Sequence, residues 1–151
     1  MYKGIKTKRT TKYSYKTTYK YDSNGNMIEK SIYELLETRK INIKFNYTYK
    51  YDSDGNMIEK SDYKSDGSFN RKSTYKYDSF GNEVEETNYT PEGYSSKNIH
   101  TYNSEGILIE KYRRIGGNFL ESKTTYEYDS SGNLIDVSTY DSSKVLKWNH
   151  T

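Results

Sequence analysis

The residues best suited to chemistry recur in one phrase, Tyr-x-Tyr-Asp-x-x-Gly-Asn, which is rich in carboxylate and amide oxygens. Its copy at 52–56, Asp-Ser-Asp-Gly-Asn, looks like the opening of a calcium loop, since Ca²⁺ binds carboxylate and carbonyl oxygens. The other copies replace Asp54 with Asn24, Phe80, Glu105 and Ser131. Because phenylalanine cannot ligate a metal, we interpret the phrase as a turn and predict neither a metal site nor a cofactor.

The other groups that could support catalysis are scattered. His100 and His150 are the only histidines, neither belongs to a ligand-spaced motif, and cysteine is absent. No Gly-x-Ser-x-Gly, phosphate loop or dinucleotide fingerprint is present. Glu83 and Glu85 share a predicted strand face, but sugar hydrolysis needs two carboxyl groups in a cleft, one with its pKa raised by burial. We therefore predict a protein that is not an enzyme.

The phrase occurs five times, at intervals of 25 to 30 residues between its glycines. An acid followed three residues later by glycine predicts a type I turn with a left-handed glycine, the three-residue hairpin loop with a G1 bulge. The fourth copy carries Asn103 in place of the acid. The residues assigned to these structural turns are Asp22, Gly25, Asp52, Gly55, Asp78, Gly81, Gly106, Asp129 and Gly132.

This turn predicts a register for each hairpin. If the strands alternate without interruption, Tyr21 faces Met27, Lys20 faces Ile28, and Ser31 lies on the same side as the tyrosines. Tyrosines of successive copies then form ladders on one face, where cross-strand aromatic pairs stabilise a sheet. The candidate ligand or partner face consists of Tyr19, Tyr21, Tyr49, Tyr51, Tyr75, Tyr77, Tyr102, Tyr126 and Tyr128.

Composition and periodicity together predict an all-β fold. Alanine is absent, 19 of the 151 residues are tyrosine, and the supply of other apolar side chains is too thin for a thick core. A second, weaker turn lies between copies, and 33–41 is interpreted as a longer loop. We expect about ten or eleven strands in one antiparallel meander, forming an open twisted or curled sheet. The single domain spans 1–151, with repeats near 13–38, 39–68, 69–93, 94–119 and 120–146.

The repeated phrase resembles the tyrosine–aspartate (YD) repeat of RHS-type proteins, especially short polar variants from Bacteroidetes. The resemblance covers about residues 13–146 in five copies of roughly 26 residues. It implies a spiralling β-sheet and an extracellular or cell-surface location. In large members the sheet closes around a toxin, but this chain is too short for a shell and has no toxin domain. The resemblance therefore implies the sheet and not the delivery of a toxin.

Three functions remain open. The first is a structural or protein-interaction module, and the second is a carbohydrate-binding module that uses exposed tyrosines. Choline- or glucan-binding aromatic repeats are similar but normally keep several tryptophans, whereas this chain has only Trp148. The third is an intracellular partner that neutralises a toxin, and no residue in the sequence specifically favours it. Nucleic acid is disfavoured as a partner because Thr101 and Glu127 interrupt the lysine row, which a phosphate track would need intact.

The ends of the chain suggest where a partner binds. Residues 1–20 are rich in lysine, which discourages edge-to-edge strand pairing. Near the other end, the candidate docking edge consists of Val145, Leu146 and Trp148. We expect a protein partner or self-association there, with a cell-surface glycan as the alternative ligand. No apolar run approaches the roughly 20 residues of a membrane span, and the N-terminus lacks the apolar segment of a signal peptide.

Overall fold

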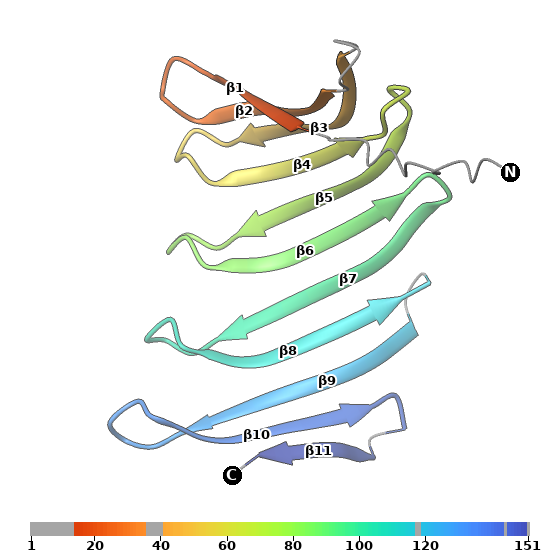
Figure 1. Cartoon of the computed structure of the whole chain (residues 1–151). Helices are drawn as coiled ribbons and strands as arrows, with labels where there is room; N and C mark the ends of the chain where they lie inside the picture. The colour runs from red at the N-terminus through yellow and green to blue at the C-terminus, as the bar shows by residue number, and fades with distance from the viewer. Residues whose placement is uncertain (1–13, 36–40, 117–118, 144, 151) are drawn as a thin grey trace, which may run out of the picture.

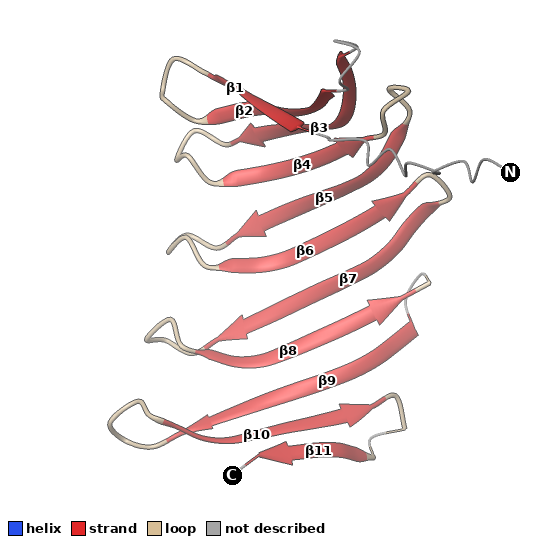
Figure 2. Cartoon of the chain, viewed as in Figure 1, coloured by secondary structure: helices blue, strands red, loops and turns tan. Residues whose placement is uncertain are grey.

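In a computed structural model of the chain, the structure describes residues 14–35, 41–116, 119–143 and 145–150. These residues form a single sheet of eleven strands (Figure 1). The strand order in space follows the order in sequence, every neighbouring pair is antiparallel, and the two edge strands do not pair with each other. Only strands and connecting loops occur in the described residues (Figure 2). The predicted open all-β meander is confirmed.

The strands group into five hairpins followed by one further strand. The elements are β1 (Ser14–Tyr21), β2 (Met27–Leu35), β3 (Ile41–Tyr51), β4 (Met57–Tyr63), β5 (Phe69–Tyr77), β6 (Glu83–Thr90), β7 (Gly93–Tyr102), β8 (Leu108–Ile115), β9 (Phe119–Tyr128), β10 (Leu134–Asp141) and β11 (Leu146–His150).

The turn inside each hairpin has the predicted geometry. In the first copy the N–H of Gly25 donates to the carbonyl of Asp22 at 3.2 Å, which closes a type I turn. The N–H of Asp22 donates to the carbonyl of Asn26 at 2.9 Å, and Gly25 has a φ of 87°. That positive φ is strained for a residue with a Cβ, so glycine is required at this position.

The turns between hairpins are less uniform. The β4–β5 turn repeats the same pattern, with the N–H of Lys64 donating to Ser68 and that of Gly67 donating to Lys64. By contrast, β6 and β7 are joined by a two-residue loop between Thr90 and Gly93. The interpretation of 33–41 as a loop is wrong at its ends, because residues 33–35 belong to β2 and Ile41 begins β3.

The predicted register is wrong beyond the first pair of each hairpin. Tyr21 pairs with Met27 as expected, but Lys20 pairs with Glu29, because Ile28 is an extra residue in a β-bulge. Ser31 consequently pairs with Thr18 and lies on the face opposite the tyrosines. The same bulge recurs in every hairpin. The five bulged residues, one per copy, are Ile28, Ile58, Val84, Ile109 and Ile135.

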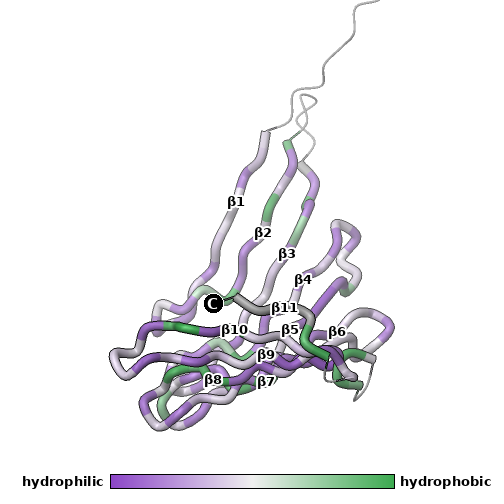
Figure 3. Tube along the Cα trace, turned by 90° about the horizontal axis from the view of Figure 1, so that it is seen from below, coloured by the Kyte–Doolittle hydropathy of each residue, from purple (hydrophilic) through white to green (hydrophobic). Residues whose placement is uncertain are grey.

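The sheet has no apolar core in the described residues, because no hydrophobic side chain there is fully buried. The buried side chains are small or polar, among them Ser31 and Ser61, each 3% exposed, and Thr87 at 4%. Hydropathy along the chain alternates in short stretches, without a long apolar run (Figure 3). The sheet is therefore stabilised by ladder hydrogen bonds and by packing between strands on each face.

The single sheet is strongly twisted. Seen along the stacking direction, β1–β3 run at a steep angle to β7–β10 (Figure 3). Right-handed twist between neighbouring strands is the normal consequence of L-amino acid stereochemistry, and each bulge increases it locally. The sheet thus has two long faces. We call the face that carries Tyr49, Tyr51, Tyr75 and Tyr77 the tyrosine face, and the face that carries Lys50, Glu59 and Lys76 the lysine face.

Candidate functional site

The turn carboxylates are occupied by their own turns. Asp52 Oδ1 accepts hydrogen bonds from the N–H groups of Asp54 and Asn56 at 3.0 and 2.8 Å, while Oδ2 accepts from Asn56 Nδ2 at 3.1 Å. The same three bonds are made by Asp22, Asp78 and Asp129. In the described part of the chain, no three histidine, aspartate or glutamate side chains are grouped to hold a metal ion.

These hydrogen bonds change the acidity of the turn aspartates. The side-chain amide and backbone N–H groups of Asn56 stabilise the charged form of Asp52 and lower the pKa of its carboxyl group. Asn103, the counterpart in the fourth copy, accepts the two backbone bonds, from Glu105 and Ile107, through its amide oxygen. The turn therefore needs a side-chain oxygen that accepts hydrogen bonds at this position. The second carboxylate oxygen of aspartate accepts one further bond, from the side-chain amide of the asparagine that follows the glycine.

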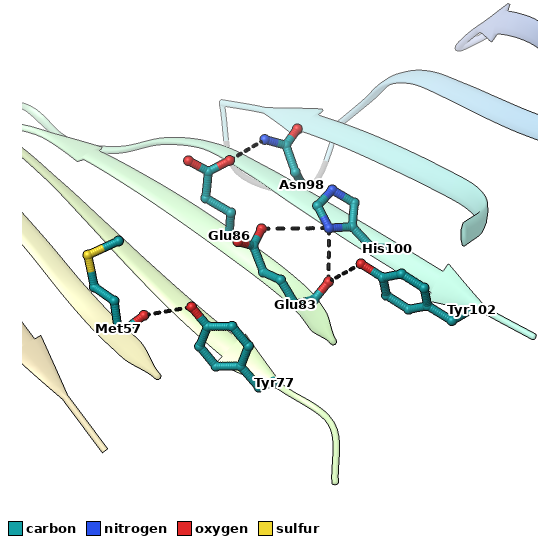
Figure 4. Close-up of polar contacts among 7 residues, drawn as sticks. All are labelled: Met57, Tyr77, Glu83, Glu86, Asn98, His100 and Tyr102. Carbon is teal, nitrogen blue, oxygen red and sulfur yellow. Dashed lines mark hydrogen bonds and ion pairs between the residues drawn. The ribbon is translucent and has the colours of Figure 1, made fainter. Parts of the chain in front are cut away.

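In the second to fifth repeats, the second tyrosine of the phrase links its repeat to the preceding one. Tyr77 donates its hydroxyl hydrogen to the carbonyl of Met57 at 2.8 Å, and Tyr102 donates to the carbonyl of Glu83 at 2.9 Å (Figure 4). Tyr51 and Tyr128 make the same bond, to the carbonyls of Met27 and Leu108, at 2.9 Å each. The acceptor is always the first residue of the even-numbered strand in the preceding hairpin. These bonds give the tyrosine ladder a structural role.

Burial of the tyrosines depends on position in the sheet. Tyr19 and Tyr21, on the edge strand β1, are 50% and 59% exposed, whereas their counterparts in the later repeats are half-buried. Burial raises the pKa values of Tyr49, Tyr75 and Tyr77. The structure thus places all nine predicted tyrosines on one face, and the two on the edge strand are the most open to a ligand or partner.

The fourth repeat departs from this pattern through His100, which takes the place of a first tyrosine. His100 Nδ1 lies 3.0 Å from the carbonyl oxygen of Glu83 and 3.6 Å from its Oε1 (Figure 4). Burial raises the pKa of the Glu83 carboxyl group. The carbonyl of Glu83 is therefore contacted by both His100 and Tyr102, so the histidine reinforces the contact between repeats.

The lysine face carries a ladder of ion pairs. Lys50 Nζ lies 2.8 Å from Glu59, and Glu85 lies between Lys76 and Lys97 at 3.1 Å from each. Lys20 is paired with Glu29 at 2.9 Å. The lysines that interleave with tyrosines in the sequence are thus each matched by a glutamate on the neighbouring strand.

A polar groove lies on the tyrosine face at the middle of the sheet. Its volume is about 370 Å³, and strands β3 to β6 line it. Tyr47 on β3 and Tyr75 on β5 both line it, together with Asp62 on β4, which pairs with Tyr47. The remaining lining side chains are Lys60, Arg71, Ser73, Glu86 and Asn88.

Sequence reasoning did not identify this groove, although Tyr75 belongs to the predicted ladder. The position of Asp62 relative to the turn glycine is occupied by Ile32, Asn88, Arg113 and Thr139 in the other repeats. It therefore produces no repeating signal. The available signal was the run Tyr47, Tyr49, Tyr51, whose alternate spacing places all three rings on one face.

The candidate docking edge is partly described. Val145 and Leu146 are 54% and 48% exposed, and Leu146 pairs with Tyr140 at the start of β11. The backbone of Trp148 pairs with Thr139, but its side chain lies outside the described residues. The lysine run in residues 1–13 also lies outside them.

Comparison with known proteins identifies a fold and not a family. No family model and no curated protein matches the chain. The structure TcdB2-TccC3-Cdc42 is similar with a TM-score of 0.60 and 16% identity, over 89% of this chain and 10% of that one. The Tc holotoxin pore of Photorhabdus luminescens, carrying the TccC3 mutation D651A, matches with a TM-score of 0.59 and 14% identity, over 88% and 9% of the two chains.

A third structure, TcdB2-TccC3-TEV, matches with a TM-score of 0.58 and 15% identity over 90% of this chain and 8% of that one. The chain thus spans about a tenth of the length of these structural relatives. No helix in the described residues is long and apolar enough to cross a membrane. At these identities the likeness establishes the fold, a β-repeat sheet similar to a section of the Tc toxin proteins TcdB2 and TccC3.

Proposed function

We propose that the chain is a non-enzymatic structural and protein-interaction module of the YD-repeat type, which binds a further copy of itself through the exposed edges of the sheet. The observation that carries this proposal is the bond between repeats, a tyrosine hydroxyl on the carbonyl of the preceding hairpin, present at all four junctions between hairpins. The chemistry that joins one repeat to the next is thus built into the repeat itself.

Among the described residues, at one edge of the sheet the tyrosine donor of this contact has no acceptor, and at the other edge the carbonyl acceptor has no tyrosine donor. Tyr21, the first member of the donor series, is 59% exposed, and no described tyrosine reaches the carbonyl of Leu134, the last member of the acceptor series. Exposed apolar side chains are also present at both edges, as they are at several places between them. Those at the edges are Tyr15, Tyr19 and Tyr21 on β1, and Leu134, Ile135, Val145 and Leu146 on β10, β11 and the turns beside them. Such surface favours association over solvation.

The test is molar mass by light scattering after size-exclusion chromatography, over a hundredfold range of protein concentration. We expect the mass to rise above one chain as concentration increases. The variant Val145→Asp/Leu146→Asp tests the β11 edge, and Tyr19→Asp/Tyr21→Asp tests the β1 edge. Each should shift the rise to higher concentration, because a charge at a desolvated contact opposes association.

Phe80→Asp is the matched control, because Phe80 is 88% exposed at a turn tip between β5 and β6, away from both edges. It should associate like the unmodified chain. A mass of one chain at every concentration would refute self-association. Equal effects of all three variants would show that general surface hydrophobicity, and not the sheet edges, causes it.

A further inference from the structure

Beyond its proposed role in assembly, we propose that the groove between Tyr47 and Tyr75 is a binding site for an uncharged carbohydrate, one or two sugar rings in size. The site shares only Tyr75 with the tyrosine ladder and lies away from the sheet edges. It is the place on the tyrosine face where non-repeating polar residues from β3 to β6 converge.

The floor of the groove contains a carboxylate whose hydrogen-bonding capacity is only half used. Asp62 is 9% exposed, and its Oδ2 lies 3.4 Å from Arg71 Nη2. Its Oδ1 is buried without any hydrogen-bond partner. A buried acceptor left unsatisfied costs roughly 1–3 kcal/mol and is uncommon in folded proteins. A turn of the Asp62 side chain towards the groove would present this covered oxygen to a ligand hydroxyl, which supplies the donor that it lacks.

A second unsatisfied acceptor lies behind the wall of the groove. Asn98 is 7% exposed and donates from Nδ2 to Glu86 Oε2 at 2.7 Å, while its own Oδ1 has no partner. Glu86 lines the groove, and the hydrogen bond from Asn98 on β7 fixes the orientation of its carboxylate (Figure 4). Ser73 Oγ likewise donates to Asn88 Oδ1 at 2.6 Å. The lining side chains are therefore held in place by their neighbours before a ligand arrives.

The two rings are offset along the groove. Tyr47 pairs with Asp62 and Asp62 pairs with Arg71, so Tyr75 lies two strands across and four residues along from Tyr47, and the two backbones are separated by about 16 Å. A volume of about 370 Å³ lies at the lower end of the range for small-molecule pockets. Tyrosine combines an apolar ring with a polar hydroxyl, so it can contact both the C–H face and the hydroxyls of a sugar.

The charges of the lining select against ions. Lys60 and Arg71 carry two positive charges, and Asp62 and Glu86 carry two negative charges, so the formal charge of the lining is zero. A net anion or cation gains no Coulombic advantage there. A polyhydroxyl ligand can both donate to the carboxylates and accept from the lysine and arginine, which matches the mixed lining.

The experiment is a titration of ¹⁵N-labelled chain with cellobiose, maltose and N,N′-diacetylchitobiose, followed by the NMR shifts of the backbone amides. We expect saturable shifts for at least one sugar, concentrated in β3 to β6. Asp62→Ala should weaken that binding at least tenfold. The matched control Asp54→Ala removes an exposed turn carboxylate from the same hairpin and should leave the affinity unchanged.

Three results would overturn the proposal. The first is the absence of saturable shifts with every sugar, and the second is a set of shifts centred on Tyr19 and Tyr21, which would indicate the exposed ladder instead. The third is tighter binding of glucuronate or glucosamine than of the neutral sugars. Because the map is measured on the unmodified chain, the proposal can fail even if Asp62→Ala does not fold.

Discussion

At the scale of the residue, the hydroxyl of tyrosine explains why this chain uses tyrosine where other sheets use aliphatic side chains. The ring supplies half-buried apolar area, and the hydroxyl satisfies a carbonyl of the preceding hairpin, as Tyr77 does for Met57. Phenylalanine would provide the apolar area without the hydrogen bond to the carbonyl. Tyrosine therefore supplies both contributions in a sheet whose described residues form no apolar core.

We predict that Tyr77→Phe lowers the free energy of unfolding by about 0.5–1.5 kcal/mol, because it removes one part-buried hydrogen bond. For a chain of this length each 1 kcal/mol lowers the unfolding temperature by about 2–4 °C, which calorimetry resolves. Tyr21→Phe is the matched control, because Tyr21 is largely exposed on the edge strand β1, where no preceding hairpin offers a carbonyl to its hydroxyl. Equal losses in the two variants would contradict a role for the hydroxyl contact.

A second prediction concerns acid. Turn hydrogen bonds lower the pKa values of Asp22, Asp52, Asp78 and Asp129 in the folded chain. A depressed folded-state pKa adds stability that is fully present above the unfolded value, about 3.9, and is lost as pH falls through the folded value. We expect the unfolding temperature to decline below about pH 4.

The effect should weaken in the variant Asp52→Asn, which cannot gain a proton at that turn. Asn103 shows that a neutral side chain is accommodated at the equivalent position. The measurement is the unfolding temperature between pH 7 and pH 2.5 for both proteins. A slope with pH that is unchanged in the variant would show that other carboxyl groups, such as those of the lysine face, dominate acid unfolding.

At the scale of the element, the bulge decides which face each side chain occupies. With Val84 set aside as an extra residue, Lys76 pairs with Glu85 and completes an ion pair at 3.1 Å. If Val84 were paired instead, every later residue of β6 would change faces. Thr87, which is 4% exposed, would then leave its buried position.

We therefore predict that deletion of Val84 is tolerated better than deletion of Thr87. The first deletion removes the unpaired residue and keeps Lys76 opposite Glu85, whereas the second shifts Asn88 and Tyr89 to the opposite faces. The measurements are circular dichroism and thermal unfolding. We expect the first variant to keep a folded sheet that unfolds a few degrees earlier, and the second to lose its cooperative transition. The reverse order would contradict the assigned register.

At the scale of the whole molecule, each hairpin contacts only its neighbours, so stability is a sum of local and junction contributions. The edge strands have one paired side each, and the central strands have two. Among the described residues, each strand contacts only its neighbours in the sheet, so no distant contact joins the two ends. The sheet therefore differs from a globular domain, in which all elements share one core.

This arrangement predicts a gradient of amide hydrogen exchange. Exchange should be fastest in β1 and β11 and slowest in β5–β8, because the edge strands can open without disturbing more than one neighbour. Mass spectrometry of peptides from the exchanging chain measures the gradient. Uniform protection across the sheet would show that it opens only as a unit. Self-association through the edges would raise protection in β1 and β11 as protein concentration increases.

The turns and the strand order are determined by the sequence alone. An acid and a glycine three residues apart select the type I turn and the positive φ of residues such as Gly25 and Gly81, which is local chemistry. Short connections then leave antiparallel neighbours as the only arrangement. Five repeats of this phrase are therefore sufficient to predict a meander of five hairpins.

The register, the tyrosine contacts between repeats and the Asp62 groove were decided by the tertiary structure. A bulge residue such as Ile58 is β-branched, like many residues that pair in strands. The sequence therefore does not distinguish a bulged position from a paired one. Asp62 and Glu86 are brought to one groove by pairing between strands of different hairpins, a non-local relation. Local turn geometry depends only on consecutive residues. A site shared by strands of different hairpins depends on the pairing register of all the strands between its residues. One unrecognised bulge shifts that register and moves side chains to the other face.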